Sequence, residues 1–272
     1  MRKRRLKPSG RASWHHCYNR VAGAVRDRPL GPEERAVFLQ IAQRLSELYT
    51  IEVVAFCVLG NHFHLLVWVP GEEPSAGEVC RRYARFYRGR RRIREGSRRC
   101  REWQKRCRDL SWYMRHLEQM FAVWYNGSRG VGRRGSVWAG RYRNTLVEGA
   151  EGVWRCWLYV EGNGVRAGLA RRGSGYRYCT LGRREGWVRM ERLVEAVGEL
   201  AGVRTVEELR RLGDEIVSER AGWLGVEGRY WVNGRVVGRY EHVVVAVKGG
   251  RGPPVRLTEG LYAACACRRW AV

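Results

Sequence analysis

The sequence predicts an α+β fold, an antiparallel sheet with helices on one face, and two patterns carry this prediction. Two apolar runs, 52–58 and 63–69, have the length and β-rich composition of strands, and Leu59-Gly60-Asn61 separates them. Residues 32–49 begin with a proline and two glutamates and then place apolar residues at helical spacing, as an amphipathic helix does. The first pattern predicts a hairpin, and the second predicts a helix that packs on it.

The other expected elements follow from the same two periodicities. They are strands at 13–21 and 144–148, and helices at 110–124, 152–163, 188–200 and 206–219.

The chain changes character beyond about residue 172. A linker-like stretch precedes the last two helices, and Asn233-Gly234 then marks the turn of a further hairpin of type I′. We therefore expect a basic tail at 1–12, a main domain at 13–182 and a small α+β C-terminal extension at 183–272.

The composition indicates a polyanionic partner. The chain has 272 residues, with 52 Lys and Arg against 27 Asp and Glu and a formal charge of +25. Nearly all of the basic residues are arginine, which grips phosphate with a planar fork and stacks on bases. Because many aromatic residues are scattered among the arginines, the pattern favours nucleic acid over a lipid surface.

Neither the cysteines nor the hydropathy indicates secretion or a membrane span. The nine cysteines show no CxxC spacing, which fits a reduced compartment, and no apolar run has the length of a membrane span. No apolar run follows the basic N-terminus either, so we expect a cytoplasmic protein without a membrane partner.

Two histidines, with one residue between them, stand at the start of the second apolar run: His62 directly before it and His64 within it. Side chains alternate along a strand, so His62 and His64 point to one face, and Phe63 and Leu65 point to the other. This arrangement permits a metal site, but the motif taken alone slightly favours two imidazoles that pack or form simple hydrogen bonds.

Tyr159 and Asn163 stand four residues apart on the helix expected at 152–163. This spacing puts them on one helical face, where they can address a single point. Two ordinary roles remain open, because Tyr159 also fits a half-buried core position and Asn163 followed by Gly164 also fits a helix cap.

Residues 78–108 are dominated by arginine and have few acidic partners. Such a run is either a solvated helical face or a surface that a phosphate backbone neutralises, and we favour the second interpretation. A glycine-rich loop near residue 130 adds further arginines but has no P-loop spacing. The expected DNA-binding residues are Arg81, Arg82, Arg85, Arg88, Arg133, Arg134, Arg141 and Arg143.

Five segments, in this order, resemble the REP-associated tyrosine transposases, a branch of the single-tyrosine HUH transposases. They are WHHCYNRV at 14–21, VVAFCVLGNHFHLLVWVP at 53–70, GSVWAGRYRNTLVE at 135–148, LYVEGNGVRAGLA at 158–170 and GYRYCTLG at 175–182. The resemblance implies a ferredoxin-like, HUH transposase-like catalytic domain over 13–182.

The resemblance also implies roles for the residues above. His62 and His64 match the metal-binding pair, Tyr159 matches the catalytic nucleophile, and Asn163 matches the polar residue that completes the metal site. The family usually has Asn-Pro where this chain has Asn163-Gly164, and Met-Pro-Asn where it has Leu59-Gly60-Asn61. With a glycine on each side of Asn163, we expect a loosened helix end at this position.

These roles imply a DNA transposase that cleaves and rejoins single-stranded or hairpin DNA through a 5′-phosphotyrosine. Mg²⁺ or Mn²⁺ would be the cofactor, and hairpins of repeated palindromic elements would be the partner, for a monomer or a homodimer. Two alternatives stay open: a non-catalytic single-stranded nucleic-acid-binding protein, and a metal-dependent nuclease that uses water.

Overall fold

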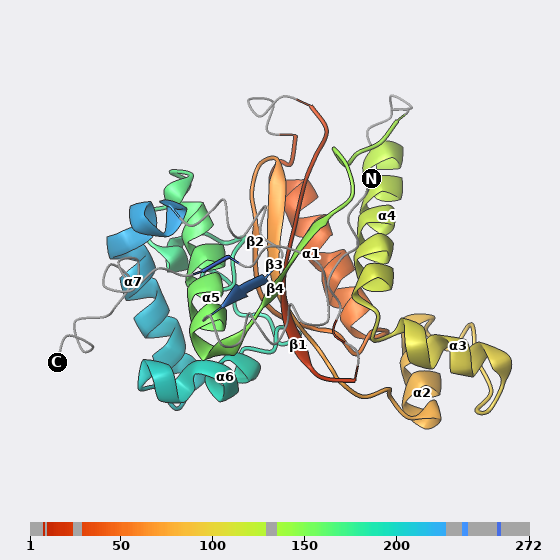
Figure 1. Ribbon diagram of the computed structural model, residues 1–272. Coiled ribbons are helices and arrows are strands. Elements are labelled where there is room, and N and C mark those ends of the chain that lie inside the picture. Colours follow the sequence, from red (N-terminus) through yellow and green to blue (C-terminus); the bar gives the residue numbers. More distant parts are fainter. Residues whose placement is uncertain are drawn as a thin grey trace.

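The computed structural model describes residues 8, 10–23, 29–128, 135–226, 236–238 and 255–256. Within these ranges the chain forms a central sheet between two groups of helices (Figure 1).

The sheet has the strand order β2-β3-β1-β4-β5-β6. Its strands are β1 Ser13–Arg20, β2 Glu52–Val58, β3 His62–Val69, β4 Arg143–Val147, β5 Val236–Gly238 and β6 Val255–Arg256. The first four strands pair antiparallel, with β1 between β3 and β4, and β5 and β6 continue the sheet in parallel pairing. The order of the first four is the ferredoxin-like order, so the predicted α+β class, the antiparallel sheet and the hairpin of β2 and β3 are confirmed.

Seven α-helices accompany the described strands. They are α1 Pro32–Ser46, α2 Ala76–Phe86, α3 Arg98–Arg106, α4 Leu110–Ser128, α5 Gly149–Arg166, α6 Glu191–Ala201 and α7 Val206–Val226. Pro32 stands in the first turn of α1, where its missing N–H costs no helical bond. Ser75 and Ser97 cap α2 and α3 by accepting the N–H of Glu78 and Cys100, so the arginine-dominated run forms two separate helices.

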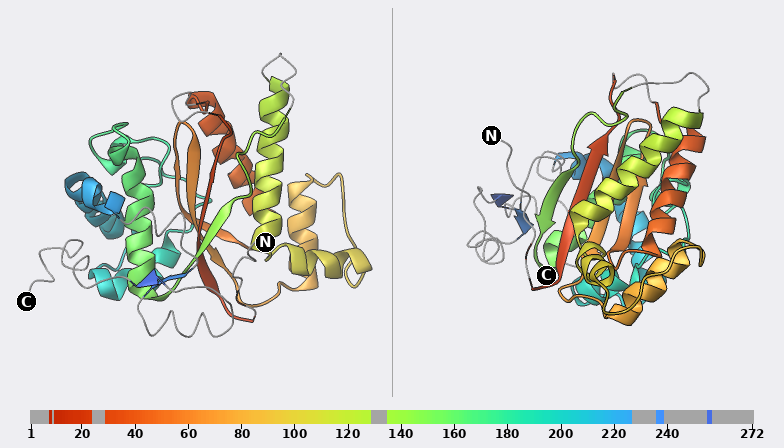
Figure 2. Two further views of the ribbon diagram at one scale, coloured as in Figure 1. Left: turned by 45° about the horizontal axis from the view of Figure 1, so that its top comes forward. Right: turned by 90° about the vertical axis from the view of Figure 1, so that its right-hand side faces the viewer.

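The helices cover both faces of the sheet, which corrects the prediction of helices on one face. The two crossover helices α1 and α4 lie side by side on one face, where Phe38 of α1 contacts Phe63 of β3 and Phe121 of α4 (Figures 1 and 2). On the other face, Tyr159 of α5 contacts His64 of β3. Phe63 and His64 are neighbours on one strand, so their side chains point to opposite faces.

The sequence of β2 already indicates that both faces of the sheet are buried. The six residues from Val53 to Val58 are all buried, and a strand buried on both sides has a nearly continuous apolar run in place of an alternating one. The run VVAFCV therefore fits a central layer better than a sheet with one solvated face.

Helices α6 and α7 pack on α5 and share its core. Gly213 of α7 stands against the ring of Trp157, which is fully buried, and a Cβ at residue 213 would overlap that ring. Leu193 and Leu209 are also fully buried in the same cluster. The two helices predicted for the extension thus form, and the division at residue 182 stays a prediction.

The hairpin predicted at Asn233-Gly234 has its turn outside the described residues. Among the residues that are described, β5 lies beside β4 in parallel register, with Leu146 opposite Val236. No helix in the described ranges is both long and apolar enough to cross a bilayer.

Candidate active site

Strand β3 places both histidines at the end of the sheet where the hairpin turns. His64 is 1% exposed and His62 is half-buried, and their ring centroids are 5.0 Å apart. Both rings lie on the face that α5 covers, as the alternation along the strand predicts.

Helix α5 brings Tyr159 to this pair. The Tyr159 ring meets the His64 ring edge to face with 5.3 Å between the centroids, and the Tyr159 side chain is 2% exposed. The two residues are far apart in sequence, so only the packing of α5 on the sheet could bring them together. The structure therefore places the predicted nucleophile beside one of the predicted metal ligands.

A hydrogen bond to Asn61 determines which ring nitrogen of His62 keeps a free lone pair. Nδ1 of His62 donates to the side-chain oxygen of Asn61 over 2.6 Å, because an amide oxygen only accepts. A neutral ring with the proton on Nδ1 keeps a lone pair on Nε2. Asn61 thus holds the His62 ring in one orientation, as the outer partner of a metal-ligating histidine would do.

His64 has a comparable partner in His16 of β1. A hydrogen bond of 3.0 Å joins Nε2 of His16 and Nδ1 of His64, and the two rings stack with 5.1 Å between centroids. Nε2 of His64 is buried and has no hydrogen-bond partner among the described residues. A buried polar atom without a partner is costly, and a bound cation would satisfy this one.

The surroundings of both predicted ligands favour the neutral imidazole. Burial lowers the pKa of His62 to about 4, with the charge of Arg166 as a smaller cause. Burial likewise holds the pKa of His64 well below its usual range, assisted by His62, His16 and Arg166. Metal ligation needs the neutral ring, so this environment suits a cation site.

Asn163 is held firmly one helical turn after Tyr159. Its side-chain nitrogen donates to the carbonyl of Tyr159 over 2.7 Å, its oxygen accepts from Arg166, and the residue is 2% exposed. An amide oxygen has two lone pairs, so the Arg166 bond leaves one for a further contact. The Asn163 oxygen therefore keeps one acceptor position, which its predicted role as a metal ligand requires.

Glycine after Asn163 does not loosen the helix, contrary to the expectation above, because α5 continues to Arg166. Gly164 makes room for another ring: a Cβ at residue 164 would lie 2.6 Å from Cδ1 of Tyr176. Tyr176 in turn donates from its hydroxyl to the carbonyl of Val58 at the end of β2. The departure from Asn-Pro thus goes with tight packing of α5 against the segment that follows it.

The donor set restricts the kind of cation site. Within the described part of the chain, no three His, Cys, Asp or Glu side chains gather in a metal-binding arrangement. A metal site at His62 and His64 would therefore need ligands of another kind, such as the Asn163 oxygen and oxygen atoms of a phosphate. Imidazole with amide and phosphate oxygens suits Mn²⁺ or Mg²⁺ in an open site.

Sequence reasoning missed three residues at this site: His16, Tyr18 and Arg166. The Tyr18 ring lies 5.1 Å from that of His64, and the Arg166 guanidinium carbon lies 4.9 Å from the Tyr159 ring centroid. Arg166 stands seven residues after Tyr159, so helical periodicity gave a signal for it. His16 and Tyr18 share a face of β1, but only the pairing of β1 with β3 puts them beside His64.

Arg166 also affects Tyr159, the predicted nucleophile. Burial raises the pKa of Tyr159, and the charge of Arg166 together with its hydrogen bond to the tyrosine lowers that pKa in part. Arg166 therefore favours the phenolate, which is the nucleophilic form.

The predicted DNA-binding arginines fall into separate groups. Arg81, Arg85 and Arg88 are exposed on or just after α2, and Arg141 and Arg143 are exposed before and on β4. Arg133 and Arg134 lie outside the described residues.

Arg143 is the member of this set that β-pairing brings towards the histidines. It lies opposite Tyr18 of β1, and Tyr18 lies opposite His64 of β3.

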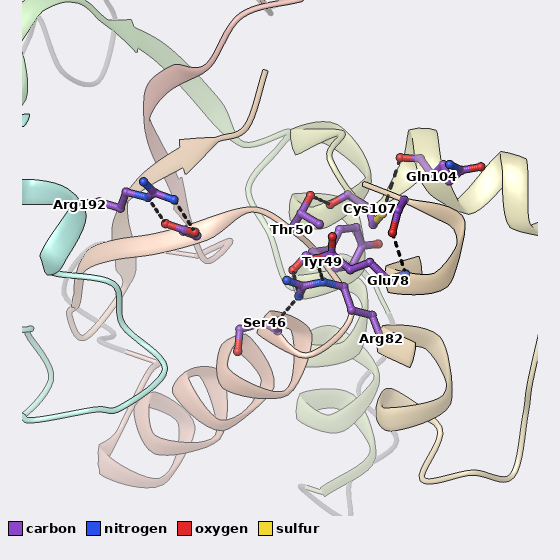
Figure 3. Close-up of polar contacts among 10 residues, drawn as sticks. Ser46, Tyr49, Thr50, Glu78, Arg82, Gln104, Cys107 and Arg192 are labelled. Atoms are coloured by element: carbon purple, nitrogen blue, oxygen red, sulfur yellow. Dashed lines mark hydrogen bonds and ion pairs between the residues drawn. The ribbon is translucent and has the colours of Figure 1, made fainter. Parts of the chain in front are cut away.

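Arg82, which the sequence predicts to bind DNA, instead forms contacts within the protein. It pairs with Glu78 over 2.8 Å and donates to the carbonyls of Ser46 and Tyr49 over 3.2 and 2.9 Å (Figure 3). These carbonyls end α1 and the turn after it, so Arg82 ties α2 to α1 and most of its donors are used within the protein.

Comparisons with known proteins give one structural likeness. No family model and no curated protein matches the chain. The fold is similar to a solved structure described as a REP-associated tyrosine transposase bound to a REP hairpin. That match covers 70% of this chain and 89% of the other at 16% identity, with a TM-score of 0.44.

Proposed function

We propose that this chain is a DNA transposase that cleaves and rejoins single-stranded or hairpin DNA through Tyr159. The observation that carries the proposal is the contact of the buried Tyr159 ring with His64, whose Nε2 has no partner among the described residues. A nucleophile beside an open ligand atom is what phosphoryl transfer by a side chain requires. The motifs of the resemblance and the net charge of +25 support the same substrate class.

His62, His64 and Asn163 would hold the metal ion, for which we propose Mg²⁺ or Mn²⁺. When bound, the ion supplies positive charge that polarises a nonbridging phosphate oxygen and stabilises the transition state. The protein supplies the remaining parts. Asn61 and His16 orient the two histidines, and Arg166 holds Asn163 and favours ionisation of Tyr159.

The proposed step exchanges one phosphorus–oxygen bond for another. The Tyr159 oxygen forms a bond to phosphorus while the bond to the 3′ oxygen breaks, and the proton lost by the phenol is balanced by the proton gained by the 3′ oxygen. The DNA is left as a 5′-phosphotyrosine. Because the bond energy is kept in this link, attack by another strand's 3′-OH reverses the step and rejoins DNA without ATP.

A covalent adduct tests the proposal. A labelled hairpin oligonucleotide with a single-stranded flank is incubated with protein and Mn²⁺ or Mg²⁺, and the products are separated on a denaturing gel. We expect an adduct with the wild type and none with Tyr159→Phe or His64→Ala. Tyr113→Phe is the matched control, because Tyr113 is fully buried in α4 and its hydroxyl has no partner in the described structure.

Other outcomes would replace the proposal with its alternatives. Cleavage that survives Tyr159→Phe would show a nuclease that uses water. Binding of the oligonucleotide without cleavage by the wild type would show a non-catalytic binding protein.

A further inference from the structure

A polar pocket of about 530 Å³ opens at the end of the sheet opposite to the histidines. Its walls are the C-terminal turn of α1, helix α2 and the segment 186–189. Glu52 of β2 pairs with Trp68 of β3 near this end, whereas His62 begins β3 at the other end. Along β3, Trp68 lies four residues from His64 and six from His62, which is about 13 to 20 Å at about 3.3 Å per residue.

The α2 wall is fixed by Arg82. Its bonds to the carbonyls of Ser46 and Tyr49 and to Glu78 join α2 to the end of α1 (Figure 3). Thr50, which follows the turn after α1, is also held in place, because its N–H and its hydroxyl both donate to the carbonyl of Cys107. The pocket therefore has a preorganised floor on this side.

The opposite wall is fixed to β2. The N–H of Arg189 donates to the carbonyl of Val53 over 2.9 Å, and the ring of Trp187 stacks on that of Phe56 with 5.8 Å between centroids. Both contacts belong to the backbone or to a buried ring, so they leave the Arg189 side chain exposed at the rim.

Three exposed arginines face this pocket with unused charge. Arg81 and Arg85 stand one turn apart on α2, and Arg189 approaches from the other wall. Within the described part of the chain, no ion pair or side-chain hydrogen bond engages any of the three.

The acidic groups of the pocket do not cancel this charge. The lining contains four arginines, the three above and Arg82, against Glu47 and Glu78, which leaves an excess of two positive charges. Glu78 is already paired with Arg82. A phosphate backbone is the partner that neutralises such a cluster, and guanidinium groups bind phosphate oxygens in pairs.

We infer that this pocket binds phosphates of the nucleic-acid strand at a point remote from the cleavage site. The inference rests on the proposed function and deepens it, because it assigns a second anchoring site to the same substrate. Arg189 joins Arg81 and Arg85 in this site although it follows them by about a hundred residues.

Salt dependence of binding tests the inference. Binding of a fluorescent hairpin oligonucleotide with a stem of at least ten base pairs is measured by anisotropy between 50 and 200 mM salt. We expect the triple variant Arg81→Gln, Arg85→Gln, Arg189→Gln to bind more weakly. The slope of log K against log salt should become shallower by about one unit per arginine, about three in total.

Two matched proteins control for net charge and folding. The first is Arg171→Gln, Arg204→Gln, Arg211→Gln, which removes three exposed arginines from another part of the surface and should change the slope by less than one unit. The second is the triple lysine variant at 81, 85 and 189, which keeps the charge and should keep most of the slope.

The outcomes separate this inference from the proposed function. A wild-type salt slope in the triple glutamine variant would overturn phosphate binding by the pocket. An equally reduced slope in the control with glutamine at 171, 204 and 211 would overturn it too. A shallower slope specific to the pocket, together with absence of a Tyr159 adduct in the wild type, would support the pocket and reject the catalytic proposal. A wild type that binds no nucleic acid would overturn both.

Discussion

Replacement of His16 by phenylalanine tests the assignment of His64 as a metal ligand. His16 is fully buried, and its Nε2 forms the hydrogen bond of 3.0 Å to Nδ1 of His64. Ligation through Nε2 requires the proton of His64 on Nδ1, and that proton needs an acceptor. Phenylalanine keeps a ring of similar size at residue 16 but cannot accept the proton.

The expected loss of metal affinity follows from that single bond. A buried N–H that loses its acceptor costs about 1 to 3 kcal/mol. At 1.4 kcal/mol per tenfold, this amounts to roughly 5- to 140-fold weaker binding of Mn²⁺. Loss of an outer-shell partner typically weakens metal binding by about 10- to 100-fold, which agrees with this range.

The assay is a titration with Mn²⁺ in which free ion is measured by its electron paramagnetic resonance signal. His15→Phe is the matched control, because His15 is the neighbouring histidine, is 1% exposed and bonds to Ser13 and Asn144 instead of His64. Thermal unfolding of both variants shows whether each is folded. Wild-type Mn²⁺ affinity in a folded His16→Phe protein would refute the role of His16.

Three further predictions concern α5. Arg166→Gln should raise the pKa of Tyr159, because Arg166 lowers it in the native site; the pH dependence of adduct formation should shift to higher pH, and an unchanged profile would contradict this. Gly164→Ala should lower the melting temperature by several degrees, because the new Cβ would meet the ring of Tyr176; a melting curve equal to the wild type would show that Tyr176 moves freely. The third prediction concerns Glu161, whose pKa burial raises to about 7. Because the folded pKa lies above the unfolded value of 4.5, the contribution of Glu161 to the free energy of unfolding should be greatest below about pH 4.5 and should fall by up to about 3 kcal/mol as pH rises through 7. Denaturant unfolding at pH 5 and pH 8 measures this fall, which should shrink in Glu161→Gln; an equal fall in both proteins would assign it to other groups.

Much of the local structure could be predicted from periodicity. The hairpin of β2 and β3, the amphipathic α1 and the helices α4 to α7 form where the sequence predicts them, with ends that differ by a few residues. Each of these elements depends on residues close in sequence, so side-chain spacing is enough to identify it. The same spacing correctly aimed His62 and His64 at one face of β3.

Roles that depend on long-range partners could not be predicted in this way. Arg82 belonged to a run expected to bind DNA, yet it holds the end of α1 through carbonyls more than 30 residues earlier in the chain. Gly164 suggested a loose helix end, whereas its missing side chain admits Tyr176. The carbonyls that Arg82 binds and the ring that Gly164 admits do not stand at a helical or strand spacing from them, so no local sequence pattern could predict these contacts.

The sequence by itself determined the elements, the charge, and which side chains share a face of a strand or helix, because each is set within a few residues. The tertiary structure decided that helices cover both faces of the sheet, that His16 of β1 reaches His64 of β3, and that Arg166 joins Asn163 to the Tyr159 ring. It also brought Arg189 to the same pocket as Arg81 and Arg85. These arrangements arise when strands pair and helices pack across long stretches of chain, because burial and hydrogen bonding select partners in space and not along the sequence.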